Sequence, residues 1–483
     1  MTHSKTTNAG ILLGFLVFAA FFQVNGQSFD AFIARMNSLP QASRQAVADS
    51  FMNSGHALPY IEQDSVVHFV YNVHATSVAL AGDATGWNPD QPFTAISGCN
   101  FSYLTKTYEP DARLDYKLVT DGSNWILDPK NPYTCAGGFG PNSELRMPAY
   151  VVPPETRYYN AIPHGVVRDT TFTSAGLGNS RQVSIYLPDG YPSGREQYPV
   201  ILFHDGTDYI NLGNIGNILD YLIAERQMSP VIAVFVPPVD RTAEYAGAKI
   251  DLFTAFIVNE LMPVIDAKYK TSRDPSQRAM AGASDGGNIS LYIGMKHPEM
   301  FGKIAAQSSD VQTVISNTFA NGPKLNLDLY IDIGTYDIAV LIPMVHNLHD
   351  ILVSKAYPCM FREWHEGHSW GNWKGHLRLP LLRFFPYTTG MNEALPQDGF
   401  RLGPVTPDPF YGNTSIPFSA PSGSVITISL ADLSGKTVET LFSGVVLGSD
   451  KVIEYHHHQA AGVYVLTMRD GGRVMKSLLI RAL

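Results

Sequence analysis

Residues 279–298 read AMAGASDGGNISLYIGMKHP and hold the first signal for the fold. The run AMAGAS has the length of a short buried strand, and the residues after Ser284 continue as a helix. Gly282 and Gly286 leave room for a sharp turn. A G-x-S-x-G turn between a strand and a helix is typical of a nucleophile elbow, in which the serine is exposed at the end of a parallel sheet. A flexible glycine-rich loop gives the same short pattern. Only the surrounding sequence can distinguish such a loop from a nucleophile elbow.

The surrounding sequence predicts an α/β domain over residues 154–388. Short apolar strands, such as those in YPVILFHDG, PVIAVFVPP, GKIAAQSS and LDLYIDIGTYD, alternate there with longer helical stretches. This alternation is typical of a mostly parallel sheet that helices cover on both faces. Catalytic residues of such sheets lie in loops after the carboxyl ends of strands, and Ser284 and Asp337 are both in that position.

Three residues fit a serine nucleophile and its activating pair. A serine hydroxyl reacts when an imidazole removes its proton, and the imidazole needs a carboxylate to fix its tautomer. Hydrolases of the doubly wound class carry these residues in the order serine, acid, histidine. The chain offers Ser284, then Asp337 in DIGTYDIAV, then His368 in WHEGHSWGNW.

Rival residues lie close to two of these positions. The rival acids fall within a strand, within a helix, or too near the histidine in the chain to approach its ring: Asp332, Asp350 and Glu366 respectively. We therefore favour Asp337 as the acid. His365 is the rival base, and Gly367 beside His368 favours His368.

An oxyanion intermediate needs two backbone N–H donors. The first is expected at Asp285, directly after the serine. The second is expected in the loop HDGTDY after the strand YPVILF, at Gly206 or Thr207.

Several ordered motifs carry a family resemblance over roughly residues 160–386: SIYLPDGY, ILFHDGTDY, FVPPVDRTAEY, AGASDGG, IGTYD and EGHSWGNW. Together they resemble the esterases that include enterochelin esterases, esterase D, and the feruloyl and acetylxylan esterases of carbohydrate esterase family one. The resemblance implies an α/β-hydrolase fold and a serine esterase with Ser284 as nucleophile, Asp337 as orienting acid and His368 as base. It implies no metal and no organic cofactor. The chain departs from many relatives at Asp285, where they carry an apolar residue.

Three further residues are candidates for substrate binding. Trp370 and Trp373 lie beside the candidate histidine and either wall an aromatic acyl pocket or belong to the core. Arg241 is a single cation, whereas an anionic catecholate would call for a cationic cluster.

Residues 61–153 alternate apolar and polar side chains between turn signals and predict an antiparallel β-sandwich of the immunoglobulin-like kind. AGDATGWNP and DYKLVTDGSNWILDPKNP resemble the glycogen-binding type of carbohydrate module. That resemblance implies sugar stacking on Trp87 and Trp125 and a sugar contact from Lys117. The alternative is a module that only packs on the catalytic domain.

The two ends of the chain suggest export. Residues 1–26 resemble a secretory signal peptide with a short apolar run, a retained anchor being the alternative, and residues 27–60 form a helical prefix broken at Pro40. We read residues 389–410 as a linker and residues 411–483 as a small β-sandwich. The last unit resembles the sorting domains of the type IX secretion route of Bacteroidetes-like bacteria, which implies the secretion machinery as a partner and a secreted or cell-surface location.

Composition limits the remaining classes. The 483 residues are 45% hydrophobic and carry a formal charge of −9 without a long basic run, which argues against a nucleic-acid partner. No later segment is apolar enough to span a membrane. Cys99, Cys135 and Cys359 have no metal-ligand spacing, and we expect free thiols rather than a pair between the first two. His456 and His458 share a strand face, but solvated turn residues are the favoured interpretation.

We therefore expect a secreted serine esterase that removes feruloyl or acetyl groups from plant polysaccharide or oligosaccharide. One alternative is an esterase for a siderophore trilactone. The other, from a different class, is a surface glycan-binding protein whose hydrolase domain has lost activity.

Overall fold

The computed structural model describes residues 28–191, 193, 197–387, 401–403, 405, 413–421, 423–432, 435–446, 450–456, 462–471 and 473–481. The chain divides into two compact units, Met1–Tyr387 and Thr388–Leu483. The predicted signal peptide lies outside the described residues, as does most of the predicted linker.

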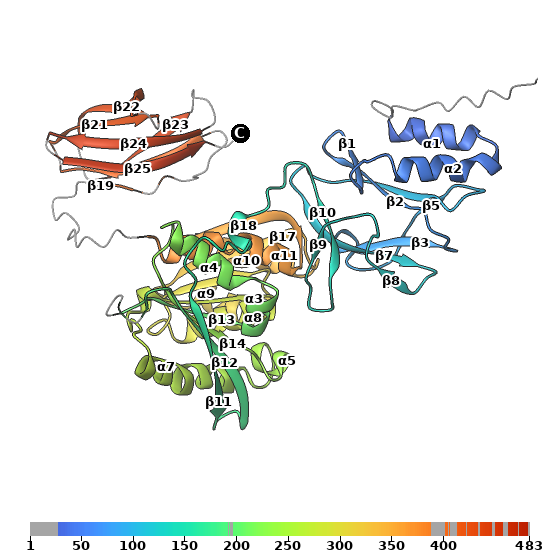
Figure 1. Cartoon of the computed structure of the whole chain (residues 1–483). Helices are drawn as coiled ribbons and strands as arrows, with labels where there is room; N and C mark the ends of the chain where they lie inside the picture. The colour runs from blue at the N-terminus through green and yellow to red at the C-terminus, as the bar shows by residue number, and fades with distance from the viewer. Residues whose placement is uncertain are drawn as a thin grey trace, which may run out of the picture. The chain divides into compact units, whose positions relative to one another are not determined.

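The described part of the first unit starts with two short helices, α1 (Phe29–Ser38) and α2 (Gln41–Met52) (Figure 1). The Ser28 hydroxyl caps α1 by accepting a hydrogen bond from the backbone N–H of Ala31 at 3.3 Å. Pro40 separates the helices because it cannot continue α1. Phe32 and Phe51 stack with ring centroids 4.4 Å apart and bury the apolar faces of the pair.

The N-terminal sandwich follows, with two sheets around one hydrophobic core. The first sheet has the order β1 (Tyr60–Glu62), β2 (Val66–Tyr71), β6 (Ser102–Thr107), β5 (Thr94–Ala95). The second contains β3 (Val78–Gly82), β4 (Gln91–Pro92), β7 (Arg113–Thr120), β8 (Asn124–Ile126), β9 (Thr134–Cys135) and β10 (Asn142–Arg146). Alternate residues such as Val67 and Phe69 of β2 meet Leu114 and Tyr116 of β7 in the core.

A larger α/β domain occupies the rest of this unit. Its strands have the order β11 (Val166–Ser174), β12 (Asn179–Leu187), β14 (Ile232–Val236), β13 (Val200–His204), β15 (Arg278–Ala283), β16 (Lys303–Gln307), β17 (Asp328–Tyr336), β18 (Cys359–Gly367). From β14 to β18 neighbouring strands are parallel, whereas β11 and β12 run antiparallel. The central strands β13, β14 and β15 are buried along their whole length and, apart from His204 and Arg278, apolar, because helices cover both faces.

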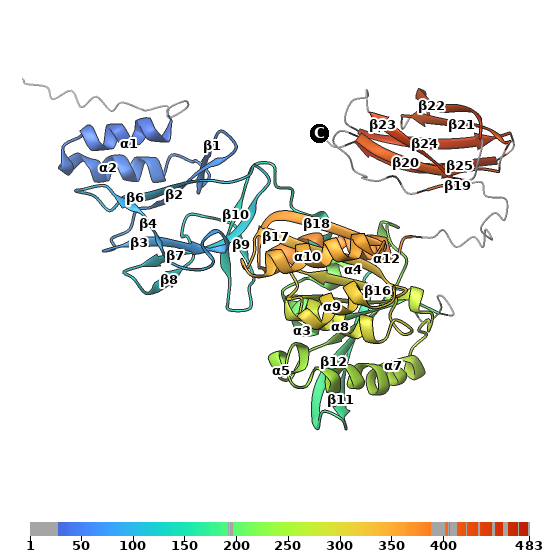
Figure 2. The same ribbon diagram turned by 180° about the vertical axis from the view of Figure 1, so that it is seen from behind.

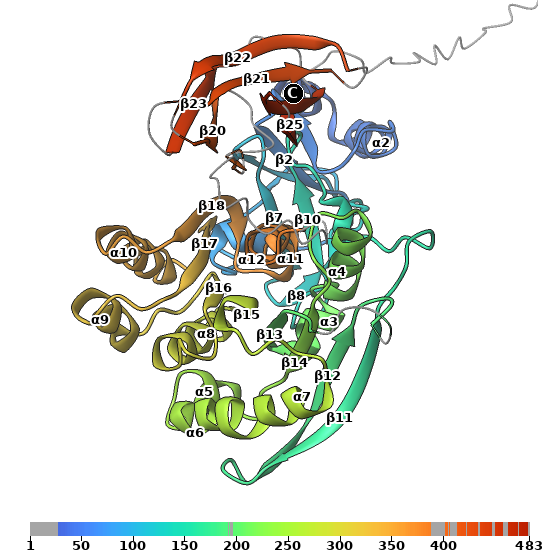
Figure 3. The same cartoon turned by 90° about the vertical axis from the view of Figure 1, so that its left-hand side faces the viewer.

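Two separate cores hold the helices on the sheet. One face packs α6 (Ile250–Ala255), the π-helical turn Phe256–Leu261, α7 (Met262–Lys268), α8 (Asp285–Lys296), α9 (Thr313–Asn321) and α10 (Leu341–Ser354). The other face packs α3 (Gly206–Asn211), α4 (Ile215–Ala224), α11 (Trp370–His376) and α12 (Arg378–Phe384). Figures 2 and 3 show α8, α9 and α10 side by side on the first face. The short α5 (Arg241–Tyr245) follows β14.

The sheet of the α/β domain continues into the sandwich. Strand β18 pairs with β7 in parallel, with Glu366 opposite Arg113, and this joins a sheet of 14 strands. The two regions keep separate hydrophobic cores but share one hydrogen-bonded sheet.

The second unit is a small β-sandwich around its own core. One sheet has the order β19 (Arg401–Leu402), β20 (Asn413–Ser419), β23 (Asp450–His456), and the other β22 (Thr437–Val445), β21 (Val425–Ala431), β24 (Gly462–Asp470), β25 (Arg473–Arg481). Within the predicted linker over residues 389–410, the few described residues include β19, which pairs with β20, and Val405, which is buried in this core. A strand of two residues is too short to show alternation in the sequence.

The three cysteines are free thiols, Cys135 buried and the other two half-buried. His456 ends β23, while His458 lies outside the described residues.

Candidate active site

Ser284 occupies a sharp turn between β15 and α8. Its backbone has φ 57° and ψ −126°, a conformation that L-residues adopt only under constraint. Two neighbours impose it: the Ser284 N–H donates to the carbonyl oxygen of Gln307 on β16 at 2.9 Å, and a Cβ on Gly282 would lie 2.1 Å from the carbonyl oxygen of Gly286. The glycine pattern in the sequence is therefore required by this close approach of backbone to backbone.

His368 and Asp337 follow the neighbouring parallel strands β18 and β17, at the same edge of the sheet as Ser284. His368 Nδ1 lies 2.7 Å from Asp337 Oδ1. The carboxylate is fully buried, and its Oδ1 also accepts the N–H of Ile338 at 2.7 Å. With a proton on Nδ1, the ring directs an unprotonated Nε2 away from the carboxylate. The geometry holds the imidazole in one orientation and one tautomer.

Ser284 and His368 line one cavity of about 710 Å³. The α/β domain contributes one wall and the N-terminal sandwich the other. The lining residues are Trp87, Asp115, Lys117, Trp125, Gly137, Gly138, Phe139, Gly140, Asn142, Asp205, Asp208, Arg241, Ser284, Ile338, His368, Ser369, Trp370 and Trp373. Neither region encloses this space alone.

The rival residues of the sequence analysis have other partners. Asp332 is buried on strand β17 and accepts hydrogen bonds from Tyr330 and Gln307, and burial raises its pKa to about 6. Glu366 bonds to His376, and His365 bonds to Asp111. The remaining acid, Asp350, is exposed on α10 next to His349.

Arg241 lines the cavity, but its guanidinium is occupied. Nε and Nη2 each donate to the carboxylate of Asp205 at 2.9 Å, and Nη1 donates to Asp285 Oδ2 at 2.9 Å. Although burial alone would lower it, the bonded Asp205 carboxylate raises the pKa of Arg241. This ion pair also accounts for the unusual acid at Asp285, which neutralises Arg241 instead of facing the cavity as a free charge.

The predicted oxyanion donors lie at the first turns of two helices. Asp285 is the first residue of α8, and Gly206 and Thr207 open α3 directly after Asp205, which has φ 53°. A Cβ on Gly206 would lie 2.3 Å from the backbone nitrogen of Val236, so only glycine fits this turn. The donor roles of these residues stay predictions.

Trp370 and Trp373 are both buried and also line the cavity. Their rings meet edge to face with centroids 5.0 Å apart, and Trp370 makes a similar contact of 5.1 Å with Tyr209. Trp373 donates from Nε1 to the Ser308 hydroxyl at 3.0 Å and lies 4.9 Å from the His368 ring. The two indoles thus belong to the core and line the cavity at the same time.

The three residues predicted to bind sugar line this same cavity. Trp125 is 44% exposed, Lys117 is half-buried, and the Trp87 indole donates to Asp83 Oδ1 at 3.2 Å. Phe139 lines the cavity too and is fully exposed in a loop with three glycines, 137, 138 and 140. Phe139 was not among the predicted site residues, because its signal in the sequence is no more than an aromatic residue within AGGFG.

Within the described residues, no group of three or more histidine, cysteine or acidic side chains is arranged to hold a metal ion. None of the helices described has the length and apolarity needed to cross a bilayer.

Comparisons with known proteins identify the α/β domain. Residues 174–384 match the model of the family described as "Putative esterase". Over 235 residues the chain is 29% identical to the uncharacterized protein YjcH of Bacillus subtilis. The aligned region covers 46% of this chain and 97% of that protein. Over 159 residues it is 35% identical to the endo-1,4-beta-xylanase/feruloyl esterase of Xylanibacter ruminicola. This aligned region covers 30% of this chain and 22% of that protein.

A solved structure agrees over a longer range. The enterobactin esterase FES from Shigella flexneri, crystallised in the presence of enterobactin, matches with a TM-score of 0.60 at 22% identity, over 70% of this chain and 97% of that chain. The likeness confirms the predicted α/β-hydrolase fold. The match of residues 174–384 to the esterase model, together with the feruloyl esterase relative, supports carboxylic ester hydrolase activity for this domain.

Proposed function

We propose that Ser284, His368 and Asp337 form the catalytic triad of this esterase. His368 Nε2 removes the proton from the Ser284 hydroxyl while Oγ attacks the ester carbonyl, and Asp337 stabilises the imidazolium that results. The tetrahedral intermediate collapses as His368 returns the proton to the leaving alcohol, which gives an acyl-enzyme. His368 then activates a water that releases the acid. The hydrogen bond of 2.7 Å between His368 and Asp337 is the observation that carries this proposal.

The oxyanion of both intermediates is held by backbone N–H groups at Asp285 and in the turn at Gly206 and Thr207. Positive ends of the helix dipoles add to this stabilisation. The ion pair of Arg241 with Asp205 and Asp285 supports it, because it ties the two turns together.

As substrate we propose a polysaccharide or oligosaccharide that carries feruloyl or acetyl esters. Five aromatic side chains around the cavity support a flat, uncharged substrate: Trp87, Trp125, Phe139, Trp370 and Trp373. Aromatic faces stack against the apolar faces of sugars and against phenolic rings. The relative described as a xylanase/feruloyl esterase agrees with this class.

The charge of the cavity disfavours the siderophore alternative. Two cations line it, but Arg241 is neutralised by two carboxylates, which leaves Lys117, and the acids Asp115 and Asp208 line the same cavity. A catecholate siderophore is a polyanion, and binding it calls for several uncompensated cations. The solved enterobactin esterase resembles this chain in fold and leaves the substrate open.

The test is a substrate panel with the full chain. Turnover of a feruloylated oligosaccharide, an acetylated xylan and a catecholate trilactone is compared between the wild type and Ser284→Ala. We expect turnover of at least one acylated glycan, no turnover of the trilactone, and a loss on the order of a thousandfold or more in Ser284→Ala. Labelling of wild type but not Ser284→Ala by a fluorophosphonate identifies the nucleophile. Wild type that resists the label and hydrolyses nothing would favour the inactive glycan-binding alternative, and selective trilactone turnover would favour the siderophore esterase.

We also propose that the protein is exported, with residues 1–26 as signal peptide and residues 411–483 as sorting domain that engages the secretion machinery. The strand-rich second unit supports this assignment. Deletion of residues 411–483 should leave esterase activity intact and block delivery to the cell surface or medium of the native host. Normal export of the deletion variant would contradict the sorting role.

A further inference from the structure

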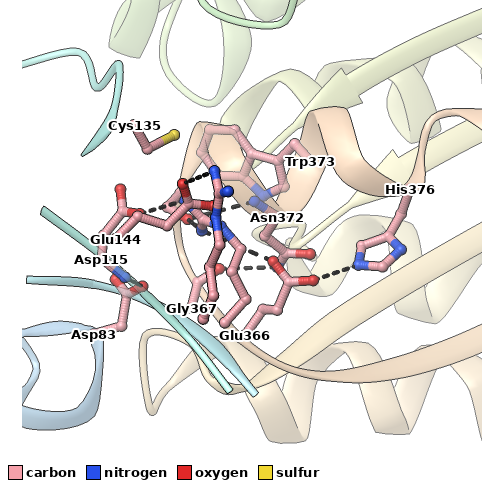
Figure 4. A network of polar contacts seen from close by, with 12 residues as sticks. Asp83, Asp115, Cys135, Glu144, Glu366, Gly367, Asn372, Trp373 and His376 are labelled. Carbon is pink, nitrogen blue, oxygen red and sulfur yellow. Dashed lines mark hydrogen bonds and ion pairs between the residues drawn. The ribbon is translucent and has the colours of Figure 1, made fainter. Parts of the chain in front are cut away.

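Arg113 is a buried cation at the junction between the sandwich and the α/β domain. It begins β7 and lies opposite Glu366 of β18, where the two regions share a sheet. Its side chain is fully buried. Figure 4 shows the polar network at this junction, with Asp115 and Glu144 on one side and Glu366, bonded to His376, on the other.

Each arm of the guanidinium has its own partner. Nε donates to Glu144 Oε1 at 2.7 Å and Nη2 to Asp115 Oδ1 at 2.5 Å, both within the sandwich. The third arm crosses to the α/β domain, where Nη1 donates to the Ser369 hydroxyl at 3.1 Å and lies 3.8 Å from Glu366 Oε2. The two carboxylates of the sandwich therefore aim the third arm at Ser369.

Ser369 directly follows His368 and fixes the turn into α11. Its hydroxyl accepts the Arg113 donor and faces the N–H of Asn372 at 3.5 Å, as an N-cap does. Its own N–H donates to the carbonyl oxygen of Gly367 at 3.0 Å. The backbone on both sides of His368 is thus held through this one residue.

Two glycines allow the segment 367–371, which we call the histidine loop, to lie against the sandwich. A Cβ on Gly367 would lie 2.1 Å from Asp83 Cγ, and a Cβ on Gly371 would lie 1.9 Å from Arg113 Cζ. No other residue fits at either position without displacing Asp83 or Arg113. The loop is clamped between these two side chains and Asp337 on its other side.

The charges around Arg113 make this arrangement stiff. Burial alone would lower the pKa of Arg113, but the carboxylates of Asp115, Glu144 and Glu366 raise it, and the group stays cationic. Arg146 also bonds to Glu144, at 2.6 Å. Because a buried guanidinium loses solvation that only these partners replace, any movement of Arg113 is opposed by all of them at once.

We propose that Arg113 is a positioning residue for ester hydrolysis, which acts through Ser369 to hold the His368 ring where it meets the Ser284 hydroxyl. The N-terminal sandwich then completes the active site by supplying a part of its rigid frame. The inference rests on the proposed function, since it takes His368 as the base.

The experiment uses the full chain with Arg113→Lys, Ser369→Ala and Ser369→Thr. Lysine at position 113 keeps the positive charge but lacks the several N–H donors of the guanidinium. At position 369, alanine removes the hydroxyl that accepts from Arg113, and threonine keeps a hydroxyl. With a small soluble ester such as 4-nitrophenyl acetate, we expect kcat to fall about ten- to a hundredfold in Arg113→Lys and Ser369→Ala, with KM almost unchanged. Ser369→Thr should recover most of the loss. The rate of fluorophosphonate labelling should fall with kcat.

Arg146→Lys is the matched control, because Arg146 binds Glu144 on the side of the network away from Ser369. It should keep wild-type kcat even where its melting temperature falls. A Ser369→Ala protein with wild-type kcat, or one in which only KM changes, overturns the proposal. If Arg113→Lys does not fold, the comparison of Ser369→Ala with Ser369→Thr still tests it. His368→Ala separates the two levels: if it stays active, the proposed function fails, whereas an inactive His368→Ala beside fully active Ser369→Ala and Arg113→Lys refutes only the positioning role.

Discussion

The two walls of the cavity differ in how their side chains are held. On the α/β side, His368 and Arg241 are bonded to buried carboxylates, and Ser284 is fixed by its turn. On the sandwich side, Trp125 is 44% exposed and Phe139 fully exposed. Chemistry needs groups placed within fractions of an ångström, whereas stacking tolerates movement. On the proposed function we expect bond cleavage at the first wall and part of the substrate recognition at the second. The predictions below test this division and the packing that supports it.

The largest effect is expected at Asp337. Asp337→Asn keeps the shape of the side chain but favours the wrong tautomer of His368, so kcat should fall on the order of a thousand- to ten-thousandfold. The measurement is steady-state turnover of a small ester, with the melting temperature recorded alongside. Asp350→Asn, which changes an exposed acid on α10, is the control and should match the wild type. Near-normal turnover in a folded Asp337→Asn protein would contradict the proposed role of Asp337 in orienting His368.

Among the described residues of the α/β domain, His204 on β13 is a buried histidine without hydrogen-bond partners. Both ring nitrogens of His204 are buried without a hydrogen bond, and burial lowers its pKa from 6.5 to about 3. Between these values the unfolded chain binds more protons than the folded one, so stability falls as the pH falls below about 6.5, by about 1.4 kcal/mol per pH unit. Urea unfolding of the wild type and of His204→Phe at pH 4 to 7 measures how the free energy of unfolding depends on pH. The variant should show the shallower dependence on pH, and equal slopes would contradict the expectation.

A third prediction concerns the contact between the two regions. Gly371→Ala places a Cβ 1.9 Å from Arg113 Cζ, whereas Gly375→Ala on the same helix meets only Pro153, at 3.9 Å. We expect Gly371→Ala to lower the free energy of unfolding by about 1–3 kcal/mol and Gly375→Ala to leave it unchanged or raise it slightly. Chemical denaturation compares the two. If both alanines behave alike, the close packing between the regions does not matter for stability.

The smallest effect is expected on the sandwich wall. Trp125→Ala combined with Phe139→Ala removes two exposed rings, and KM for an acylated oligosaccharide should rise by about tenfold through lost stacking. Turnover of 4-nitrophenyl acetate should stay the same, because the ester-cleaving wall is intact. Tyr158→Ala, another exposed aromatic outside the cavity lining, is the control. Equal losses on both substrates would mean that the division between the walls is wrong.

The α/β fold could be predicted from the sequence because its signals are local. Apolar strands of five or six residues between helical stretches define a covered parallel sheet, and the glycines around Ser284 define the turn. The choice of Asp337 and His368 from chain order agrees with the bond between them, although their catalytic roles await the experiments above.

The rest depends on which distant segments meet. The pairing of Arg241 with Asp205 and Asp285 joins the first turns of three helices, and no spacing along the chain predicts it. Arg113 and Ser369 are 256 positions apart, and a lone arginine at the start of a strand looks like a solvated residue in the sequence. Phe139 was missed for the same reason, since an exposed ring gains meaning only from the cavity below it.

The shared sheet has a consequence for how this enzyme can change over evolution or be engineered. Modules joined by a flexible linker can be exchanged as cassettes, because few contacts cross the boundary. Here a crossover at the apparent boundary near Pro153 would separate Arg113 from Glu366 and Ser369, and Asp83 from Gly367. A chimera that takes the sandwich from another esterase must therefore bring the matching end of β18 with it, and these two stretches should be inherited as one unit.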